Sequence, residues 1–577
     1  MNALMNPLNY VARGFLIGTI PSTLAAGGLD SPAGSATVRG LAFVTFAFIA
    51  RIVLSNLQGV LARALGNSLD RILDQRVMRS LNRPAGLSHL EDPKVSDQLG
   101  VIQGVGTVAY RPGDAVSGLA MRVSTWLAGL GAAILLAGFR WWLAVALSVV
   151  FLWAARVTLR DYLVMMKVAV AQAPTLRRGH YYRDQAFVPP AGKEVRIFGL
   201  GDWFVDRFRS SWFEAMGPIW KERAGGAALR VASIAMSAGS VVGAVLIGFA
   251  AINREINIGD VALYLGALGG LYSFGQGYGP GDLALQHGLV SLPVIREFEE
   301  KFKDQATEAQ PAPRDIPKSQ IRFDRVSFTY PGTSEEVLSN LDLEIPAGRS
   351  SAIVGVNGAG KTTIVKLLCR FYEPTDGRIL VDDVNLASLG AIDWQPRVAA
   401  IFQDFIRYEL TARENISFGS AAGNQSDESL RLAAERAGVL GLIEALPKGW
   451  DTVLSRRVTD GVDLSGGEWQ RVALARALFA VESGARILVL DEPTANLDVR
   501  AEAELYSNFL ELVSGITTVL ISHRFSTVRR ADVINVLEEG RVIEKGSHAE
   551  LMALNGRYAH MFSLQASRFV EPVSGNS

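Results

Sequence analysis

The chain has 577 residues, of which 49% are hydrophobic and 20% are charged, and this length predicts two to four domains. Its 57 basic and 57 acidic residues cancel, which excludes a chain that is basic throughout, as a nucleic-acid binder can be, and also long disorder. The single cysteine, Cys369, excludes an internal disulfide scaffold and a multi-cysteine zinc site. A mean hydropathy of +0.21 favours a membrane protein.

Apolar runs dominate the first half of the chain, and several reach the roughly 17–20 residues that a transmembrane helix needs. Six of them lie at about 11–27, 41–60, 123–139, 141–157, 231–252 and 261–274. The first is the weakest, because it contains Arg13 and Pro21. Arg51, in the second, is expected to face other helices or a cavity, since an arginine in lipid is costly. The runs predict a polytopic α-helical membrane domain with six transmembrane helices.

The connections between these runs differ in length and charge. The short ones, at 30–38, Arg140 and 253–259, carry few basic residues, whereas 61–122 and 158–230 are long and rich in arginine. The positive-inside rule therefore places the N-terminus, both long connections and everything after the sixth run in the cytoplasm. This spacing of charge argues against buried helices of a soluble enzyme. The long connections are expected to continue the membrane helices into the cytoplasm, and no cleavable signal peptide pattern occurs.

A polar segment with three prolines, 306–318, is typical of a linker. We therefore predict a transmembrane domain at 1–305, a linker at 306–318 and a second domain at 319–577. Residues 1–318 carry 31 basic and 23 acidic side chains, so the membrane half is net positive and the second half is equally net negative. The second half alternates strand-like and helix-like segments, which predicts an α/β fold.

Residues 355–362, GVNGAGKT, fit the phosphate-loop pattern G-x-x-x-x-G-K-[ST]. An apolar strand-like run, 351–354, precedes the loop and an apolar helix, 363–369, follows it, which is the context that a P-loop NTPase requires. Backbone N–H groups here can cradle phosphate oxygens, while Lys361 suits the β and γ phosphates and the Thr362 hydroxyl suits Mg²⁺. The nucleotide-binding set is Asn357, Gly358, Ala359, Gly360, Lys361, Thr362 and Thr363.

Two acids, Asp491 and Glu492, follow the apolar strand 487–490. A continuous apolar run is typical of a parallel strand buried on both faces, and ligands bind at the carboxyl ends of such strands. Asp491 is therefore a candidate Mg²⁺ ligand, and Glu492 is a candidate for polarising the attacking water. Taken alone, the pair could equally cap a helix, because Pro493 follows it.

Residues 464–470, LSGGEWQ, resemble the signature motif of ATP-binding cassette (ABC) proteins and lie between the phosphate loop and the two acids, as in that family. Tyr330 in SFTYPG, Gln403 in IFQD, Asp498 in ANLD and His523 in ISHR match further cassette elements in order, over about 260 residues. The membrane half resembles exporter-type half-transporters. Segments 193–209 and 89–99 look like the cytoplasmic coupling segments of bacterial peptide and antibiotic exporters.

The resemblance implies a role for each residue. Tyr330 stacks on adenine, although it could instead be a core tyrosine; Gln403 reaches Mg²⁺ or the lytic water; His523 contacts the γ-phosphate and orients Glu492. The signature residues and the aspartate of the ANLD motif complete the ATP site, namely Ser465, Gly466, Gly467, Glu468 and Asp498. The signature contacts the ATP held by the Lys361 of a partner, so two half-transporters form the functional unit.

The departures from the family pattern are few. Trp469 occupies a variable signature position, Asn496 replaces a small residue, and 456–460 lacks the usual glutamate, which weakens the expectation of crosstalk with the partner's coupling segment. Because Glu492, His523 and the signature are intact, a homodimer is favoured over a heterodimer.

The sequence therefore predicts ATP-driven export across a bacterial cytoplasmic membrane, by alternating access, with ATP and Mg²⁺ as cofactors. The substrate expected from the resemblance is an amphipathic antibiotic or a modified peptide, and a lipid flippase is the main alternative. No peptidase domain precedes the first run, so leader removal is not expected. A soluble ABC ATPase acting on DNA or ribosomes is disfavoured by the six apolar runs, and no nucleic-acid partner is expected. An importer is disfavoured because the two domains are fused.

Overall fold

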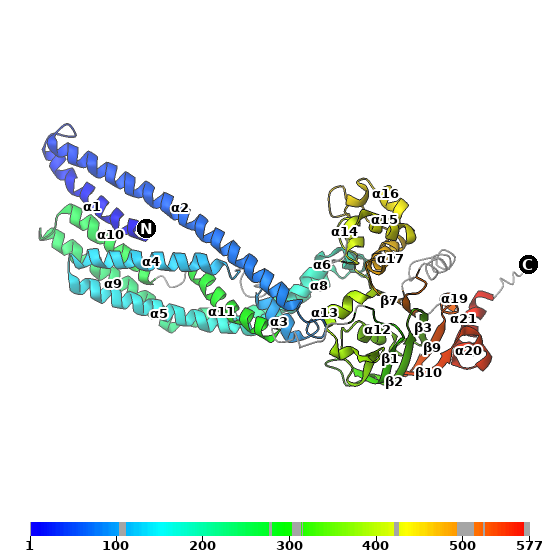
Figure 1. Ribbon diagram of the computed structural model, residues 1–577. Coiled ribbons are helices and arrows are strands. Elements are labelled where there is room, and N and C mark those ends of the chain that lie inside the picture. The colour runs from blue at the N-terminus through cyan, green and yellow to red at the C-terminus, as the bar shows by residue number, and fades with distance from the viewer. Residues whose placement is uncertain are drawn as a thin grey trace, which may run out of the picture. The chain divides into compact units, whose positions relative to one another are not determined.

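The computed structural model describes residues 2–102, 111–275, 280–302, 313, 315–420, 426–492, 513–522 and 525–570 (Figure 1). The chain divides into two compact units. The first comprises Met1–Asn82 with Glu91–Lys303, and the second comprises Arg83–Leu90 with Asp304–Ser577. Each unit is described by itself.

The described part of the first unit is helical. Its helices are α1 (Asn2–Ala25), α2 (Pro32–Leu81), α3 (Pro93–Ile102), α4 (Asp114–Ala137), α5 (Trp141–Ala171), α6 (Ala173–Phe187), α7 (Pro189–Ile197), α8 (Gly201–Gly225), α9 (Ala227–Ile252), α10 (Ile258–Gly275) and α11 (Pro280–Lys301). Each of the six apolar runs coincides with one helix, namely α1, α2, α4, α5, α9 or α10, although the runs 11–27 and 123–139 each extend two residues past the helix end. This confirms the predicted helical membrane-type domain.

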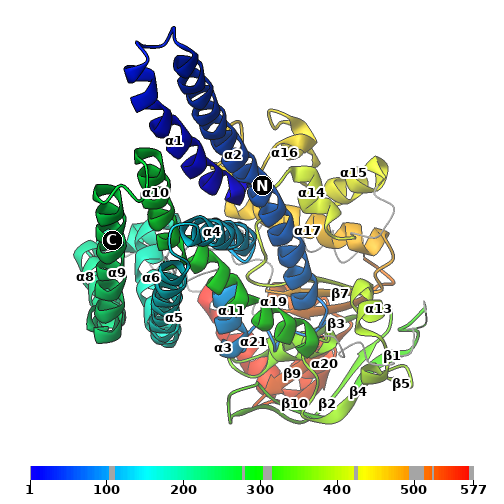
Figure 2. The same cartoon turned by 90° about the vertical axis from the view of Figure 1, so that its left-hand side faces the viewer.

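Four of these helices are long and apolar enough to cross a membrane: α2, α4, residues Trp141–Ala169 of α5, and α9. The apolar part of α10, Ile258–Phe274, is shorter. Helix α1 runs unbroken through Pro7 and Pro21, and it packs beside both α2 and α10 (Figures 1 and 2). The contact with α10 is close, because a Cβ at Gly14 would lie 2.9 Å from the carbonyl oxygen of Gly259. Small residues permit such helix pairs.

Helix α2 has 50 residues, which corresponds to about 75 Å at 1.5 Å per residue. The hydrocarbon core of a bilayer is only about 30 Å thick, so the helix extends well beyond it, as predicted for the long connections. Two separate cores match this division. One is formed by α4, α5, α9 and α10 around residues such as Phe151 and Leu271, and the other joins α2, α3 and α11 around Leu73, Val95 and Phe298.

The second unit contains two sheets. The six-stranded sheet has the order β10-β9-β3-β8-β7-β6, and all neighbours are parallel except β10 and β9. The four-stranded sheet, β2-β1-β4-β5, is antiparallel. The strands are β1 (Gln320–Thr329), β2 (Glu336–Pro346), β3 (Ser350–Gly355), β4 (Asp376–Val381), β5 (Val384–Asn385), β6 (Val398–Ile401), β7 (Ile487–Asp491), β8 (Thr517–Ile521), β9 (Val533–Glu538) and β10 (Arg541–Gly546).

Helices surround these sheets in the described part of the second unit. They are α12 (Lys361–Leu368), α13 (Ala391–Trp394), α14 (Ala412–Ser417), α15 (Asp427–Arg436), α16 (Leu440–Glu444), α17 (Gly466–Glu482), α19 (Phe525–Val528), α20 (His548–Leu554) and α21 (Arg557–Val570). One core packs α12 between the sheets through Ile364 and Leu368. Another packs α14, α15 and α17 around Trp469 and Phe479. Every residue of β7 and β8 is buried, which confirms the predicted α/β fold.

The eight residues Arg83–Leu90 belong to the second unit although they lie in the first third of the chain. The backbone N–H of Leu87 donates to the carbonyl oxygen of Phe371 (2.9 Å), and Nε2 of Gln395 donates to that of Ala85 (2.9 Å). The predicted coupling segment, 89–99, stays a prediction: its first two residues belong to this part of the second unit, and most of the others form helix α3 of the first unit.

Candidate nucleotide-binding site

The phosphate loop joins β3 to α12. Gly358 (φ 83°) and Gly360 (φ 99°) adopt the left-handed conformation that glycine tolerates best. A Cβ at Gly355 would lie 2.2 Å from the carbonyl oxygen of Leu537, a backbone atom of the neighbouring strand β9. The loop glycines are therefore required by backbone geometry and close packing, and they leave successive N–H groups at the start of α12, where phosphate binds favourably.

Lys361 is the first residue of α12 and is buried. Its Nζ donates to the carbonyl oxygens of Gly355 and Val356, at 2.9 Å each. Burial lowers the pKa of Lys361, while the nearby carboxylates of Glu492 and Asp491 oppose that change. An ammonium group has three N–H donors, so one remains for a phosphate oxygen at this place.

Asp491 ends the buried strand β7 and is itself buried, with 2% of its surface exposed. Burial raises the pKa of Asp491, a hydrogen bond from Thr362 acts against this, and the carboxylates of Glu492 and Asp404 raise it further. A buried acid with two acidic neighbours favours a nearby cation. Thr362 and Asp491 thus form a fitting pair of oxygen ligands for Mg²⁺.

The part of the chain that the structure describes holds no cluster of three or more His, Cys, Asp or Glu side chains suited to a metal. The oxygen pair of Thr362 and Asp491 fits Mg²⁺, because this ion keeps several waters and is bound by one or two protein oxygens together with substrate phosphates.

Glu492 adopts a left-handed conformation (φ 47°), and its backbone N–H donates to the carbonyl oxygen of Ile521 (2.9 Å). A residue with a side chain loses about 1–2 kcal/mol in this conformation. The chain turns away from β7 here, so the Glu492 side chain lies at the carboxyl edge of the sheet. Strained backbone of this kind concentrates at functional sites.

Gln403 reaches the same edge from the neighbouring strand. Ile401 pairs with Leu490 in the parallel register of β6 and β7, so Gln403 and Glu492 each follow the paired residues by two positions. Gln403 and its neighbour Asp404 are exposed. Asp404 was missed by motif matching, and its proximity to Asp491 is visible only in the fold.

Tyr330 directly follows β1 and is half-buried. Its hydroxyl lies 3.1 Å from Oγ1 of Thr363, and Nζ of Lys366 lies 5.0 Å from its ring centroid. Phe328 and Tyr372 contact the ring edge-on, with centroid distances of 4.9 and 5.3 Å. These contacts are those of a core tyrosine, and adenine can stack on Tyr330 only if one face of its ring stays accessible. The stacking role therefore stays a prediction.

The signature residues begin helix α17. Ser465 is the N-cap: its side chain accepts from the Glu468 N–H, and the Glu468 carboxylate accepts from the Ser465 N–H (2.7 Å). These hydrogen bonds from Ser465 lower the pKa of Glu468. Gly466 and Gly467 form the first helical turn, whose N–H groups suit an anion. Trp469 is not a neutral variation, because it is 2% exposed and its Nε1 donates to Asp463 (3.2 Å).

Residues 338–495 match the family model described as ABC transporter. This range of the chain is similar to the ATP-binding cassettes of ABC transporters. The chain is 41% identical over 262 residues to an ATP-dependent lipid A-core flippase of Nitrosococcus oceani, covering 45% of this chain and 43% of that one. It is 37% identical over 322 residues to a protein of the same name from Chromobacterium violaceum, covering 56% and 53%. An uncharacterized ABC transporter ATP-binding protein, YfiC of Bacillus subtilis, is 39% identical over 272 residues, covering 47% and 43%.

The chain therefore spans about half the length of the curated relatives it matches. A solved structure of a bacterial Atm1-family ABC exporter with ATP bound aligns with 100% of this chain and 98% of its own, with a TM-score of 0.75 and 23% identity. At this identity the likeness establishes the fold. The chain shares the fold of that structure, in which a membrane-type helical domain is joined to an α/β cassette domain.

A cavity of about 270 Å³ lies on the second unit, between the end of α12 and α17. The rings of Phe371 and Phe402, 5.8 Å apart, form part of its lining together with Phe418 and Arg476. Arg476 is held by Asn415, to which its Nε and Nη2 donate. Sequence reasoning missed this groove because its residues come from four distant segments.

Asp498, Asn496 and His523 lie outside the described residues.

Proposed function

We propose that the chain is half of an ATP-driven exporter that moves lipids or lipid-like amphiphiles across a bacterial cytoplasmic membrane. The observation that carries the ATPase part is the convergence of the phosphate loop, Asp491 and Glu492 at one edge of a buried parallel sheet. The membrane part is supported by the four helices of spanning length. The positive-inside pattern supports a cytoplasmic N-terminus and a cytoplasmic cassette.

Lipid transport is preferred to export of an antibiotic or peptide because two curated relatives are named lipid A-core flippases. Those similarities span about half of each chain. The substrate of the relatives is therefore only proposed for this chain. The substrate expected first from sequence, an antibiotic or modified peptide, becomes the alternative that an experiment has to exclude.

In this proposal Lys361 and the loop N–H groups hold the β and γ phosphates of ATP. Thr362 and Asp491, with Gln403, would hold Mg²⁺, which would supply charge neutralisation for the phosphates. Glu492 accepts a proton from the attacking water as general base, and His523 orients Glu492 toward the γ-phosphate. A base positioned in this way contributes typically about 10²–10⁴-fold to a rate.

A second copy of the chain completes each site in this proposal, because Ser465 and the start of α17 meet the ATP held by the partner's Lys361. Exposed apolar side chains support a protein interface: Phe187, Ile197 and Phe198 around α7 are 77%, 78% and 68% exposed, and such patches mark interaction sites. Closure on ATP would switch the access of the membrane domain.

The ATPase assignment is tested with Glu492→Gln and Lys361→Ala in the purified full chain in lipid nanodiscs. Glu492→Gln should retain ATP binding and lose at least about 100-fold in turnover, whereas Lys361→Ala should lose ATP binding. Glu428→Gln, an exposed glutamate on α15, is the matched control. Normal steady-state turnover by Glu492→Gln would refute its role.

The substrate is tested by ATP-dependent transport in inside-out vesicles. Fluorescent lipids are expected to move between leaflets when ATP is added, and the Glu492→Gln chain should not move them. Transport of an antibiotic or a lanthionine peptide with no movement of any lipid would reverse the preference stated above.

A further inference from the structure

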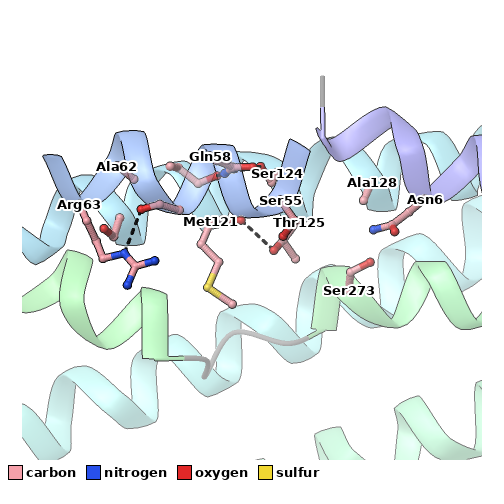
Figure 3. Close-up of a pocket in the computed structure, with 13 residues that line it drawn as sticks. Asn6, Ser55, Gln58, Ala62, Arg63, Met121, Ser124, Thr125, Ala128 and Ser273 are labelled. Carbon is pink, nitrogen blue, oxygen red and sulfur yellow. Dashed lines mark hydrogen bonds between the residues drawn. The ribbon is translucent and has the colours of Figure 1, made fainter. Parts of the chain in front are cut away.

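A cavity of about 580 Å³ lies inside the helical unit, among α1, α2, α4 and α10 (Figure 3). On α2 its lining residues are Ser55, Gln58, Gly59, Ala62 and Arg63. The spacing of three, four, seven and eight positions places them on one face of the helix. This part of α2 falls at the cytoplasmic end of the second apolar run, where polar side chains are costly unless they face the bundle or a cavity.

The opposite face of α2 is apolar. Val53, Leu57 and Leu61 are 56%, 50% and 56% exposed, and they point away from the lining stripe by their helical positions. This division assigns the apolar face to lipid and the polar stripe to the cavity. The polar stripe is therefore a lining, and not a solvated outer surface.

Helix α4 presents a matching stripe with the same spacing. Ser117, Met121, Ser124 and Thr125 line the cavity, and Gln58 joins the two helices, since its Nε2 donates to Oγ of Ser124 (2.9 Å) and to the carbonyl oxygen of Ala120 (3.0 Å). The middle of the cavity wall is thus held by bonds between helices. The Ser117 and Thr125 hydroxyls lie on opposite sides of Gln58, and that of Thr125 donates to the carbonyl oxygen of Met121 (2.8 Å).

Arg63 is the cationic residue of this lining, and it is exposed. Its Nε donates to the carbonyl oxygen of Gly59 (3.2 Å) in its own helix, which uses one of five guanidinium donors. No described carboxylate forms an ion pair with Arg63. Arg122 on α4 differs, because its Nη1 lies 2.6 Å from Asp282. Figure 3 shows Arg63 from α2 and Met121 from α4 extending into the same space.

The charge of the cavity has one sign. No described residue that lines it is acidic. At the far end of the α2 stripe Arg51 donates to Asn6, a lining residue from α1 (3.3 Å), so a second cation lies about 18 Å along the helix from the first at 1.5 Å per residue. A cationic amphiphile would find no counter-charge here, whereas an anionic group would find an arginine fork and hydroxyl donors.

We propose that this cavity binds the anionic head group of a membrane lipid, with a phosphate on Arg63 and a neighbouring oxygen on the Ser117 hydroxyl. The apolar part of the lipid then contacts Met121 and the lipid-facing side of the helices. This rests on the proposed function, which it deepens by naming the head-group chemistry and the residue that selects it. Arg63 is a specificity-determining residue for transport and takes no part in ATP hydrolysis.

The test compares Arg63→Gln with the matched control Arg39→Gln in the full chain in nanodiscs. Arg39 is also exposed on α2 and also donates to a carbonyl four residues earlier, at Ser35, but it does not line the cavity. Binding is measured by titrating fluorescent phosphatidylglycerol, with phosphatidylcholine as the zwitterionic probe and glycerol 3-phosphate as the soluble one. ATP turnover with and without each probe is measured in parallel.

Arg63→Gln is expected to weaken phosphatidylglycerol binding about tenfold and to abolish its preference over phosphatidylcholine, whereas Arg39→Gln should leave both unchanged. Arg63→Lys, which keeps the charge without the fork, should recover part of the affinity and guards against misfolding of the first variant. Equal phosphatidylglycerol binding by wild type and Arg63→Gln would overturn the proposal. It would also be overturned if soluble glycerol 3-phosphate displaced the fluorescent lipid as well as unlabelled phosphatidylglycerol does, because the site would then bind a free phosphate and not a lipid. Absence of ATP turnover in the wild type would refute the proposed function alone, because the binding measurement remains readable.

Discussion

Asp491 and Lys361 are both buried, and burial shifts the pKa of each toward its neutral form. The shifts are in opposite directions because one group is an acid and the other a base. Each charge partly compensates the other, yet Glu492 and Asp404 add negative charge beside Asp491. The site without ligands is therefore electrostatically strained, and a divalent cation with a bound polyphosphate would relieve both sides at once.

Asp491→Asn should make the nucleotide-free chain more stable at neutral pH. A raised folded-state pKa means that the folded chain binds more protons than the unfolded chain, so the Asp491 contribution to stability falls as pH rises through that pKa. The stability advantage of the Asp491→Asn variant should therefore shrink as pH is lowered toward 4. Thermal unfolding from pH 4 to 8 measures it, with the exposed Asp383→Asn as control. A difference that is constant across pH would contradict the burial argument, and stabilisation by Mg²⁺ and ATP should disappear in Asp491→Asn.

Helix α12 connects the nucleotide to the segment Arg83–Leu90. It begins at Lys361, which lies in the phosphate loop, and Cys369 caps its end. Two residues further on, the carbonyl oxygen of Phe371 accepts from Leu87. The helix core is fully packed, with Ile364, Leu367 and Leu368 completely buried, so the ends of this element are expected to move together.

Cys369 is a natural probe of this element, since it is the only cysteine of the chain. Burial raises the pKa of its thiol to about 12, which lowers the thiolate fraction at neutral pH by roughly three orders of magnitude relative to a free cysteine. We expect almost no alkylation of the folded chain by iodoacetamide at pH 7.5 and complete alkylation in denaturant, measured by intact mass. Rapid labelling of the folded chain would show that the end of α12 opens in solution.

The whole molecule is proposed to contain two composite sites, each formed by one copy's phosphate loop and the other copy's signature. Ser465→Asp allows a specific test, because aspartate is as good an N-cap as serine and so preserves the start of α17 while placing a negative charge against phosphate. Lys361→Ala removes the other half of a site. Combining the two lesions in purified mixed dimers distinguishes composite sites from sites contained in one chain.

A mixed dimer with Lys361→Ala in one copy and Ser465→Asp in the other should retain one intact site and hydrolyse ATP at up to about half the wild-type rate. A dimer that carries both substitutions in one copy beside a wild-type copy should be inactive, because each site then has one damaged half. Two affinity tags allow each mixture to be isolated. Sites contained within one chain predict the reverse pattern of activity.

The sequence predicted those parts of the site whose residues are adjacent in the chain. The phosphate loop, the buried strand β7 with its acids, and the start of α17 each combine a local backbone requirement with a local side-chain pattern. It did not predict that Arg83–Leu90 packs with the second unit, because Leu87 and Ala85 are held there through their backbone atoms. It also missed the cavity at Arg63, since hydropathy averaged over a helix conceals a polar stripe on one face.

Trp469 illustrates a further limit. The residue type at a variable motif position does not indicate whether its side chain is buried. The burial of Trp469 is evident only from the packing of α14, α15 and α17. Tyr330 shows the opposite case, in which a motif predicts a ligand contact while the fold adds Lys366 over the ring. Lys366 and adenine would both contact the Tyr330 ring, and which of them does so depends on packing that the sequence does not reveal.

The membership of Arg83–Leu90 in the cassette unit also has a consequence in time. Leu87 is synthesised about 280 residues before Phe371, its hydrogen-bond acceptor, and at about 5–20 residues per second this interval lasts about 15–60 s. During that interval the nascent chain displays the segment without the surface that later covers it. Newly made chains therefore pass through a stage in which the membrane half is present and its anchor on the cassette is not, and premature termination before Phe371 would leave that stage permanent.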